Sequence, residues 1–176
     1  MRQSMKPVML FAACLLITLV SCKPRKAIEL KAAIVQKERV AFNILLDKNG
    51  PGEQKLASLV KDDYKGALAF VDQEEKEFDK LIGEITALPA DGIKQGNELK
   101  TAAVDYYVAL KELHIFDRQE IAQREVSSHT EGEALRAAQD SIIELSRRKQ
   151  DMFKKVYEKE SAFHQALEKF SSVNGI

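Results

Sequence analysis

Apolar residues recur along the chain at steps of three and four, the spacing that places side chains on one face of an α-helix. The first such row is Ala27, Leu30, Ile34, Ala41 and Leu45, with Ile28, Val35, Phe42 and Leu46 beside it. The four prolines stand at positions 7, 24, 51 and 89, outside these rows. Because proline costs about 3 kcal/mol inside a helix, the prolines mark where helices begin and end.

These rows predict four helices. The first is expected at 24–48 and ends in the turn 49–52, and the second at 53–88. The second row is Leu56, Val60, Tyr64, Ala67, Val71, Phe78, Leu81 and Ile85, and Glu74 or Glu75 interrupts it. Four amphipathic helices with short connections favour an all-α fold, here an antiparallel up-down-up-down four-helix bundle covering residues 27–172.

The third and fourth helices follow in the same way. The third begins at 93–95, carries Leu99, Ala103, Tyr106, Leu110, Leu113 and Ile121, and ends at 127–129. The fourth has the most regular row: Leu135, Ala138, Ile142, Leu145, Met152, Val156, Phe163, Ala166 and Phe170. Lys149 and Lys159 fall within this last row, so their ammonium groups must reach water or find a partner. Tyr106, Tyr107 and Phe116 are interpreted as core residues, with a ligand pocket as the alternative.

The first 21 residues have the pattern of a secretory signal. Arg2 and Lys6 give a positive start, and residues 8–20 are apolar apart from Cys14 and Thr18. This run is shorter than the roughly 20 residues that a membrane-spanning helix needs. We therefore interpret 1–21 as a cleaved signal peptide rather than a permanent span.

The signal ends in Leu19-Val20-Ser21-Cys22, which resembles the lipobox of bacterial lipoproteins. The resemblance covers only the first two dozen residues, and the remaining chain is not assigned to a family. It implies cleavage before Cys22, a diacylglycerol on the Cys22 sulfur, and a fatty acyl group such as palmitate on the new amino terminus. The lipid bilayer would then be a partner of the chain through Cys22.

The residues after Cys22 suggest which membrane receives the anchor. In lipoproteins of this kind an aspartate after the cysteine retains the protein at the inner membrane, whereas this chain has Lys23. The resemblance therefore implies the outer membrane, and the absence of an acidic cluster implies a face toward the periplasm. We interpret 22–26 as a lipidated basic tether whose Lys23, Arg25 and Lys26 can meet anionic headgroups.

Composition excludes several classes of protein. The 176 residues contain 27 basic and 27 acidic side chains, so the chain lacks the basic excess of a nucleic-acid-binding protein. Its 45% hydrophobic content argues against disorder. Cys14 would leave with the signal and Cys22 would carry lipid, so no thiol remains for a disulfide, a catalytic thiolate or a thiolate metal site.

Candidate chemistry in the remaining chain is sparse. The histidines are His114, His129 and His164, and none follows a glutamate by three residues, as di-iron bundles require. Glu125 and Glu160 precede two of them by four residues, a spacing that suits surface pairs, or a metal site if a third ligand joins. We expect no catalytic residue, metal or cofactor. Asp140-Ser141-Ile142 resembles a short O-glycosylation motif of some exported bacterial proteins, or is an ordinary helical surface segment.

The sequence therefore favours a membrane-anchored, non-enzymatic module that binds an envelope protein, with a carrier or sensor of a small apolar ligand as the alternative. At 1.5 Å per residue the second helix spans about 54 Å and the first about 37 Å, so the second is expected to overrun the first. The overrun predicts an apolar groove beside the anchor, unless Gly66 or Gly83 breaks the second helix and the chain closes that end. The expected groove residues are Phe78, Leu81, Ile82, Ile85, Leu99, Phe163, Leu167 and Phe170.

Overall fold

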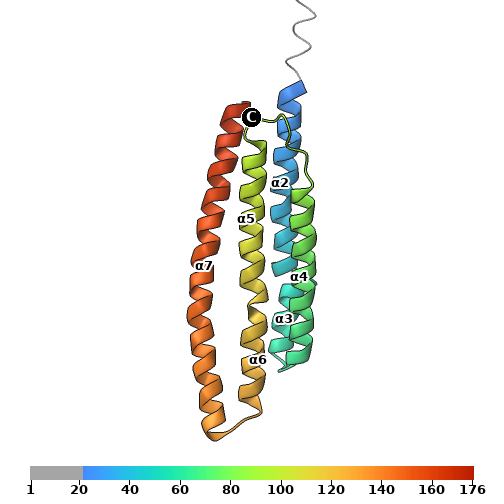
Figure 1. Ribbon diagram of the computed structural model, residues 1–176. Coiled ribbons are helices and arrows are strands. Elements are labelled where there is room, and N and C mark those ends of the chain that lie inside the picture. Colours follow the sequence, from blue (N-terminus) through green and yellow to red (C-terminus); the bar gives the residue numbers. More distant parts are fainter. Residues whose placement is uncertain (1–21) are drawn as a thin grey trace, which may run out of the picture.

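The computed structural model describes residues 22–176, and all their regular structure is helical (Figure 1). The helices are α2 (Cys22–Leu46), α3 (Pro51–Leu59), α4 (Tyr64–Thr86), α5 (Gly96–Ile115), α6 (Asp117–Ser128) and α7 (Gly132–Asn174). The all-α prediction is confirmed for this part of the chain. The predicted signal peptide, 1–21, lies outside the described residues. Among the helices from Cys22 onward, none has the length and apolar character needed to cross a bilayer.

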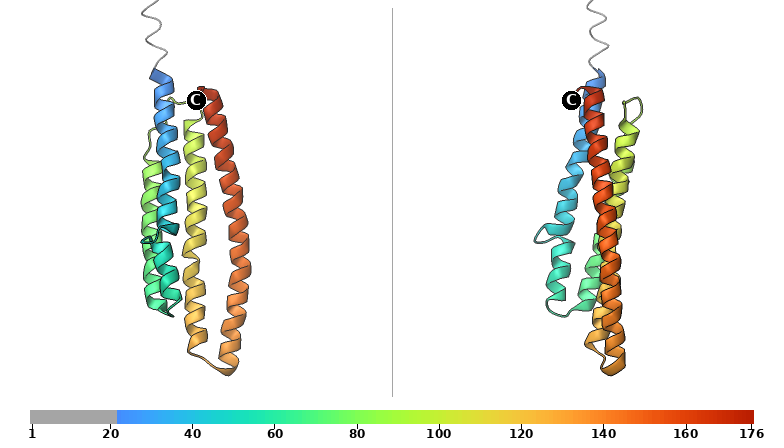
Figure 2. Two further views of the ribbon diagram at one scale, coloured as in Figure 1. Left: turned by 180° about the vertical axis from the view of Figure 1, so that it is seen from behind. Right: turned by 90° about the vertical axis from the view of Figure 1, so that its left-hand side faces the viewer.

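The helices form four long arms that lie side by side (Figures 1 and 2). α2 and α3 make the first arm, α4 the second, α5 and α6 the third, and α7 the fourth. Consecutive arms run in opposite directions, so the start of α2 and the C-terminus lie at the same end. The ion pairs agree with this arrangement: Lys37 of α2 contacts Glu84 near the end of α4, and Lys55 of α3 contacts Glu74 nearer its start.

The sequence predicted that the chain reverses at 49–52. Instead, the connection at 47–50 lets α3 continue the first arm in the same direction as α2 (Figure 2). The start of α3 lies directly against the last turn of α2. A Cβ on Gly52 would overlap the carbonyl oxygen of Leu45, so only glycine permits this approach. The predicted reversal at 49–52 is therefore wrong.

The chain reverses at residues 60–63 instead. Asp62 has a left-handed backbone conformation with φ of 55°, which turns the chain without a glycine. The Asp63 carboxylate then accepts a hydrogen bond from the Gly66 amide at 2.9 Å and caps the N-terminus of α4. The single helix predicted at 53–88 is thus two antiparallel helices, and the alternative of a break near Gly66 was closer to the structure.

Two smaller boundaries also differ from the prediction. α2 begins at Cys22, so residues 22–26, predicted as a tether, are helical. The third arm is interrupted at Phe116, which separates α5 from α6. The predicted end of the second arm near Pro89 is confirmed, because α4 stops at Thr86 and an irregular connection leads to α5.

Most of the core lies in the half of the bundle that contains the start of α2. The fully buried large side chains there come from every arm: Ile34, Ile44, Phe78, Leu81, Ile85, Leu99, Tyr107, Phe163 and Phe170. Of the first predicted row, Ala27, Leu30, Ile34 and Ala41 are buried, with Ile44 rather than Leu45 completing it. The fourth row is confirmed at Ala138, Leu145, Val156, Phe163 and Phe170.

Candidate functional site

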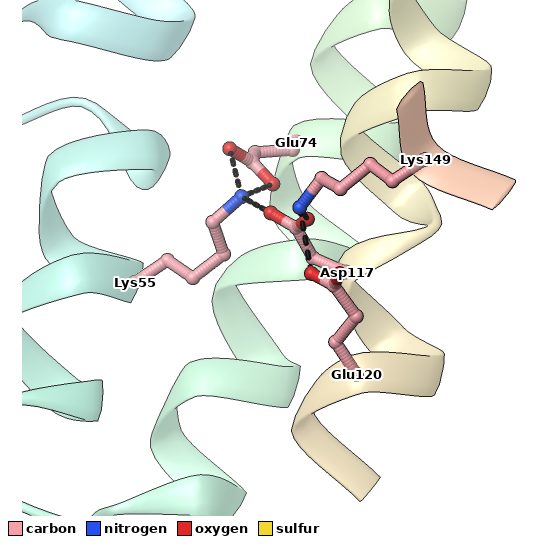
Figure 3. A network of polar contacts seen from close by, with 5 residues as sticks. All are labelled: Lys55, Glu74, Asp117, Glu120 and Lys149. Atoms are coloured by element: carbon pink, nitrogen blue, oxygen red, sulfur yellow. Dashed lines mark hydrogen bonds and ion pairs between the residues drawn. The ribbon is translucent and has the colours of Figure 1, made fainter. Parts of the chain in front are cut away.

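The most polar feature inside the bundle is a group of ion pairs joining four helices (Figure 3). It consists of Lys55 on α3, Glu74 on α4, Asp117 and Glu120 on α6, and Lys149 on α7, and is called the buried network below. Lys55 is 3% exposed and Glu74 is fully buried. Isolated charges are rarely found at such depth, so the pairing among these groups is what permits it.

Asp117 is the centre of the buried network. The Lys55 ammonium donates to both Glu74 oxygens, at 3.0 and 2.8 Å, and to Asp117 Oδ2 at 2.5 Å. The Lys149 ammonium donates to Asp117 Oδ1 and to Glu120 Oε2, the latter at 2.6 Å. Asp117 therefore bridges the two ammonium groups, and each carboxylate has at least one charged partner.

Local structure places these side chains. The interruption at Phe116 begins a new helix, so Asp117 and Glu120 occupy the first turn of α6, from which they reach Lys55 of α3 and Lys149 of α7. Lys149 stands in the apolar row of α7, and its ammonium group reaches toward these two carboxylates. The inner face of α3 carries Lys55 and Ser58, whereas Leu56 and the following Val60 are exposed.

The pKa values of Glu74 and Asp117 are shifted in opposite directions. Burial raises the pKa of Glu74, and the attraction of Lys55 only partly offsets it. Burial also acts to raise the pKa of Asp117, but Lys55 and Lys149 outweigh it and hold that pKa below its usual value. Of these two carboxylates, Glu74 is therefore the costlier negative charge.

A histidine lies beside the buried network. Burial lowers the pKa of His114 to about 4, with a further contribution from the Lys55 charge. Its ring stacks on Phe78, with 6.2 Å between ring centroids. The imidazole is thus neutral at neutral pH and packs as an aromatic side chain. His129 and His164 do not join it, and within residues 22–176 no three His, Cys, Asp or Glu side chains form a potential metal site.

The arrangement suits a structural function better than a reactive one. Both ammonium groups of the buried network pair with carboxylates of neighbouring helices. These pairs form only when the four helices are correctly aligned along their axes. Buried ion pairs add little net stability compared with apolar packing, but a broken pair is costly. The network therefore discriminates against bundles in which an arm has slipped.

The predicted groove residues lie in the core, and the groove prediction is wrong. Phe78, Leu81, Ile85, Leu99, Phe163 and Phe170 are buried, and Ile82 and Leu167 are partly buried against them. The cause is the position of the chain reversal: because α3 extends the first arm, α2 reaches the end of α4 and covers this region. Tyr107 and Phe116 are also buried, which confirms their interpretation as core residues.

A different pocket does open at the end where α2 begins. It has a volume of about 370 Å³ and lies between the first turns of α2 and the connection from α4 to α5. Its lining residues are Lys26, Glu29, Leu30, Ala33, Leu88, Pro89, Asp91 and Ile93. Lys100 donates to the carbonyls of Thr86 and Leu88, which fastens the connection that forms one wall.

Sequence reasoning found only part of the buried network. Glu74 and Lys149 were visible as charged residues within apolar rows, a signal that each needs a partner. Lys55, Asp117 and Glu120 gave no such signal, because their own local patterns do not place them in the core. The remaining predicted site, Cys22, is the first residue of α2.

Compared with protein-family models, curated proteins and solved structures, the chain has no significant match.

Proposed function

We propose that this chain is a lipid-anchored lipoprotein of the bacterial envelope that acts by binding a protein partner rather than by catalysis. In this proposal residues 1–21 are removed as a signal peptide, Cys22 carries the lipid, and an up-down-up-down bundle extends from the membrane. The lipobox resemblance at 19–22 supports the anchor, and Lys23 supports the outer membrane with the bundle in the periplasm.

The observation that carries the binding function is the outer surface of the first arm. Ile28, Phe42 and Leu46 of α2 are each more than half exposed, as are Leu56 of α3 and Val60, which directly follows α3. Single exposed apolar residues are ordinary, but several large ones along one arm mark a surface that another molecule covers. In this proposal the arm begins at the lipid anchor, so Ile28 near its start would lie closest to the membrane.

Membrane attachment tests the anchor. Cells expressing the full chain, Cys22→Ser or Cys14→Ser are separated into membrane and soluble fractions. The unmodified chain and Cys14→Ser should remain with the membrane, because two or more acyl chains give stable anchoring, and Cys22→Ser should lose the acyl chains. Cys14→Ser is the matched control, since it makes the same substitution within the predicted signal. Equal membrane binding of both variants would contradict the anchor.

The pocket beside the start of α2 favours a second candidate, a carrier of a small apolar ligand. Its volume of about 370 Å³ falls within the range of ligand sites, and Leu30, Ala33, Leu88, Pro89 and Ile93 give it apolar walls. Mass spectrometry of molecules extracted from the purified protein separates the candidates. A ligand lost on Ala33→Phe would favour the carrier, whereas no bound molecule would favour the binding module.

A further inference from the structure

Helix α2 has two apolar faces, and the bundle covers one of them. The inner face is Ala27, Leu30, Ile34, Ala41 and Ile44, all buried. The outer row, as this face is called below, is Ile28, Ala32, Val35, Phe42 and Leu46, interrupted by Arg39. Ile28, Phe42 and Leu46 are 52%, 56% and 59% exposed. A helix needs only one apolar face to pack on its own bundle, so the outer row indicates a second neighbour.

The spacing of the outer row identifies the kind of neighbour. Positions 28, 32, 35, 39, 42 and 46 alternate in steps of four and three, which is the repeat of the a and d positions in a left-handed coiled coil. The row spans about 28 Å at 1.5 Å per residue. Such a seam fits a second long helix lying alongside α2.

We propose that the outer row is the interface of a parallel homodimer, in which α2 of one copy packs against α2 of a second copy. A twofold axis along the seam places each residue of the row opposite its own counterpart. The parallel orientation rests on the proposed anchor at Cys22, because two copies attached to one membrane begin α2 at the same level.

Charge patterning permits this parallel pair. In a parallel coil the flanking residues Lys31 and Glu38 face Gln36 and Asn43 of the second copy, so no like charges meet at those positions. Arg39 stands within the seam, where the twofold axis sets it opposite its own counterpart, and Glu38 of the second copy flanks each guanidinium and offsets the repulsion between the two. Within residues 22–176 the ion pairs of α2 are Arg25–Glu29 and Lys37–Glu84, which leaves both Glu38 and Arg39 for the second copy.

A short seam is sufficient here for two physical reasons. The inner face already holds α2 as a helix, so dimer formation costs little ordering of the backbone. The membrane confines both copies to one plane, which raises their effective concentration in the way that a linker does. Two isolated peptides with this row would lack both advantages.

Disulfide cross-linking tests the interface and its orientation. Ile28→Cys and Phe42→Cys are made separately in the full chain, and membranes are oxidised and analysed without reductant. We expect both variants to form covalent homodimers, because each cysteine faces its counterpart across the twofold axis. Ser146→Cys, at an exposed position of α7, is the control and should yield several-fold less dimer.

A repulsive substitution strengthens the test. Phe42→Glu combined with Leu46→Glu should reduce the Ile28→Cys dimer several-fold while leaving thermal unfolding nearly unchanged, since both side chains are exposed. The proposal is overturned if the dimer yields at 28 and 42 do not exceed the yield at 146. It is also overturned if Ile28→Cys pairs only with a cysteine at position 46, which indicates an antiparallel pair, or only with a different protein.

The design separates failure of the interface from failure of the anchor. The chain without an introduced cysteine should give no covalent dimer, because lipidation consumes the Cys22 thiol. A covalent dimer of the chain without an introduced cysteine would contradict the anchor. The interface would then be tested with the same cysteine variants in the Cys22→Ser background. In that background the membrane no longer concentrates the copies, so the variants are oxidised over a range of protein concentrations. Cross-linking at 28 and 42 above the control then supports the interface, and its absence at every concentration overturns it.

Discussion

Replacing Lys55 by methionine removes one charge from the buried network and keeps the length of the apolar side chain. Glu74 then loses the ammonium that both its oxygens contact, at 3.0 and 2.8 Å, and it is fully buried. Asp117 loses one of its two ammonium partners but keeps Lys149. Breaking a buried pair in this way costs about 3–5 kcal/mol, because a charge remains without compensation. That is a large share of the roughly 5–15 kcal/mol that stabilises a typical domain.

Two further variants show whether burial is the cause. Lys55→Met combined with Glu74→Leu removes both charges, so it should recover most of the stability lost by the single change. Lys37→Met breaks the pair with Glu84, whose side chain is 43% exposed. Water solvates that carboxylate once the ammonium has gone, so the loss of stability should be much smaller.

Urea unfolding followed by far-ultraviolet circular dichroism measures these differences, since the chain has no tryptophan to report by fluorescence. The pH dependence gives a second readout. Burial already raises the pKa of Glu74, so its ionised form is the destabilising one, and the loss caused by Lys55→Met should shrink as the pH falls and Glu74 takes up a proton. Equal losses of stability for Lys55→Met and Lys37→Met would show that burial does not set the cost, as would a double variant no more stable than Lys55→Met.

Two other predictions concern backbone contact and histidine titration. Gly52→Ala should lower the free energy of unfolding in urea by on the order of 1–3 kcal/mol, because its Cβ would overlap Leu45. Gly83→Ala, at a helical site with open space, should raise that free energy by about 0.5–1 kcal/mol. Changes of the same sign in both variants would contradict the close contact between α2 and α3. The folded pKa of His114 is about 4 against 6.5 unfolded, so its contribution to stability is complete above pH 6.5 and is lost as the pH falls toward 4. Between about pH 7.5 and 5, the free energy of unfolding should therefore fall by roughly 2 kcal/mol more in the unmodified chain than in His114→Phe. An equal fall in both would show that His114 does not cause this pH dependence.

The sequence predicted the helices better than the position of the first chain reversal. Apolar spacing located every arm, and Pro89 marked the end of α4, because these features depend on residues close together in the chain. The reversal was misplaced because Gly50-Pro51-Gly52 has the composition of a turn, whereas Asp62 makes the real turn without glycine or proline. Composition alone does not reveal that Gly52 instead serves a close helix contact.

The inner face of α3 explains why the site was harder to predict than the fold. Leu56 and Val60 fit an apolar row yet are exposed, and Lys55 and Ser58 face inward. Lys55 can be buried because it pairs with Glu74 and Asp117 on other helices, 19 and 62 residues further along the chain. A periodicity rule weighs each segment alone, so it cannot recognise a charge whose burial depends on distant partners.

The intact mass of the protein extracted from membranes tests the proposed lipid anchor. The expected mass is that of a chain that begins at Cys22, with a diacylglycerol on its sulfur and an acyl group on its amino terminus. Hydroxylamine-resistant attachment of the diacylglycerol would agree with a thioether at that sulfur. A membrane-bound chain with an unmodified Cys22, or one that still carries residues 1–21, would contradict the anchor.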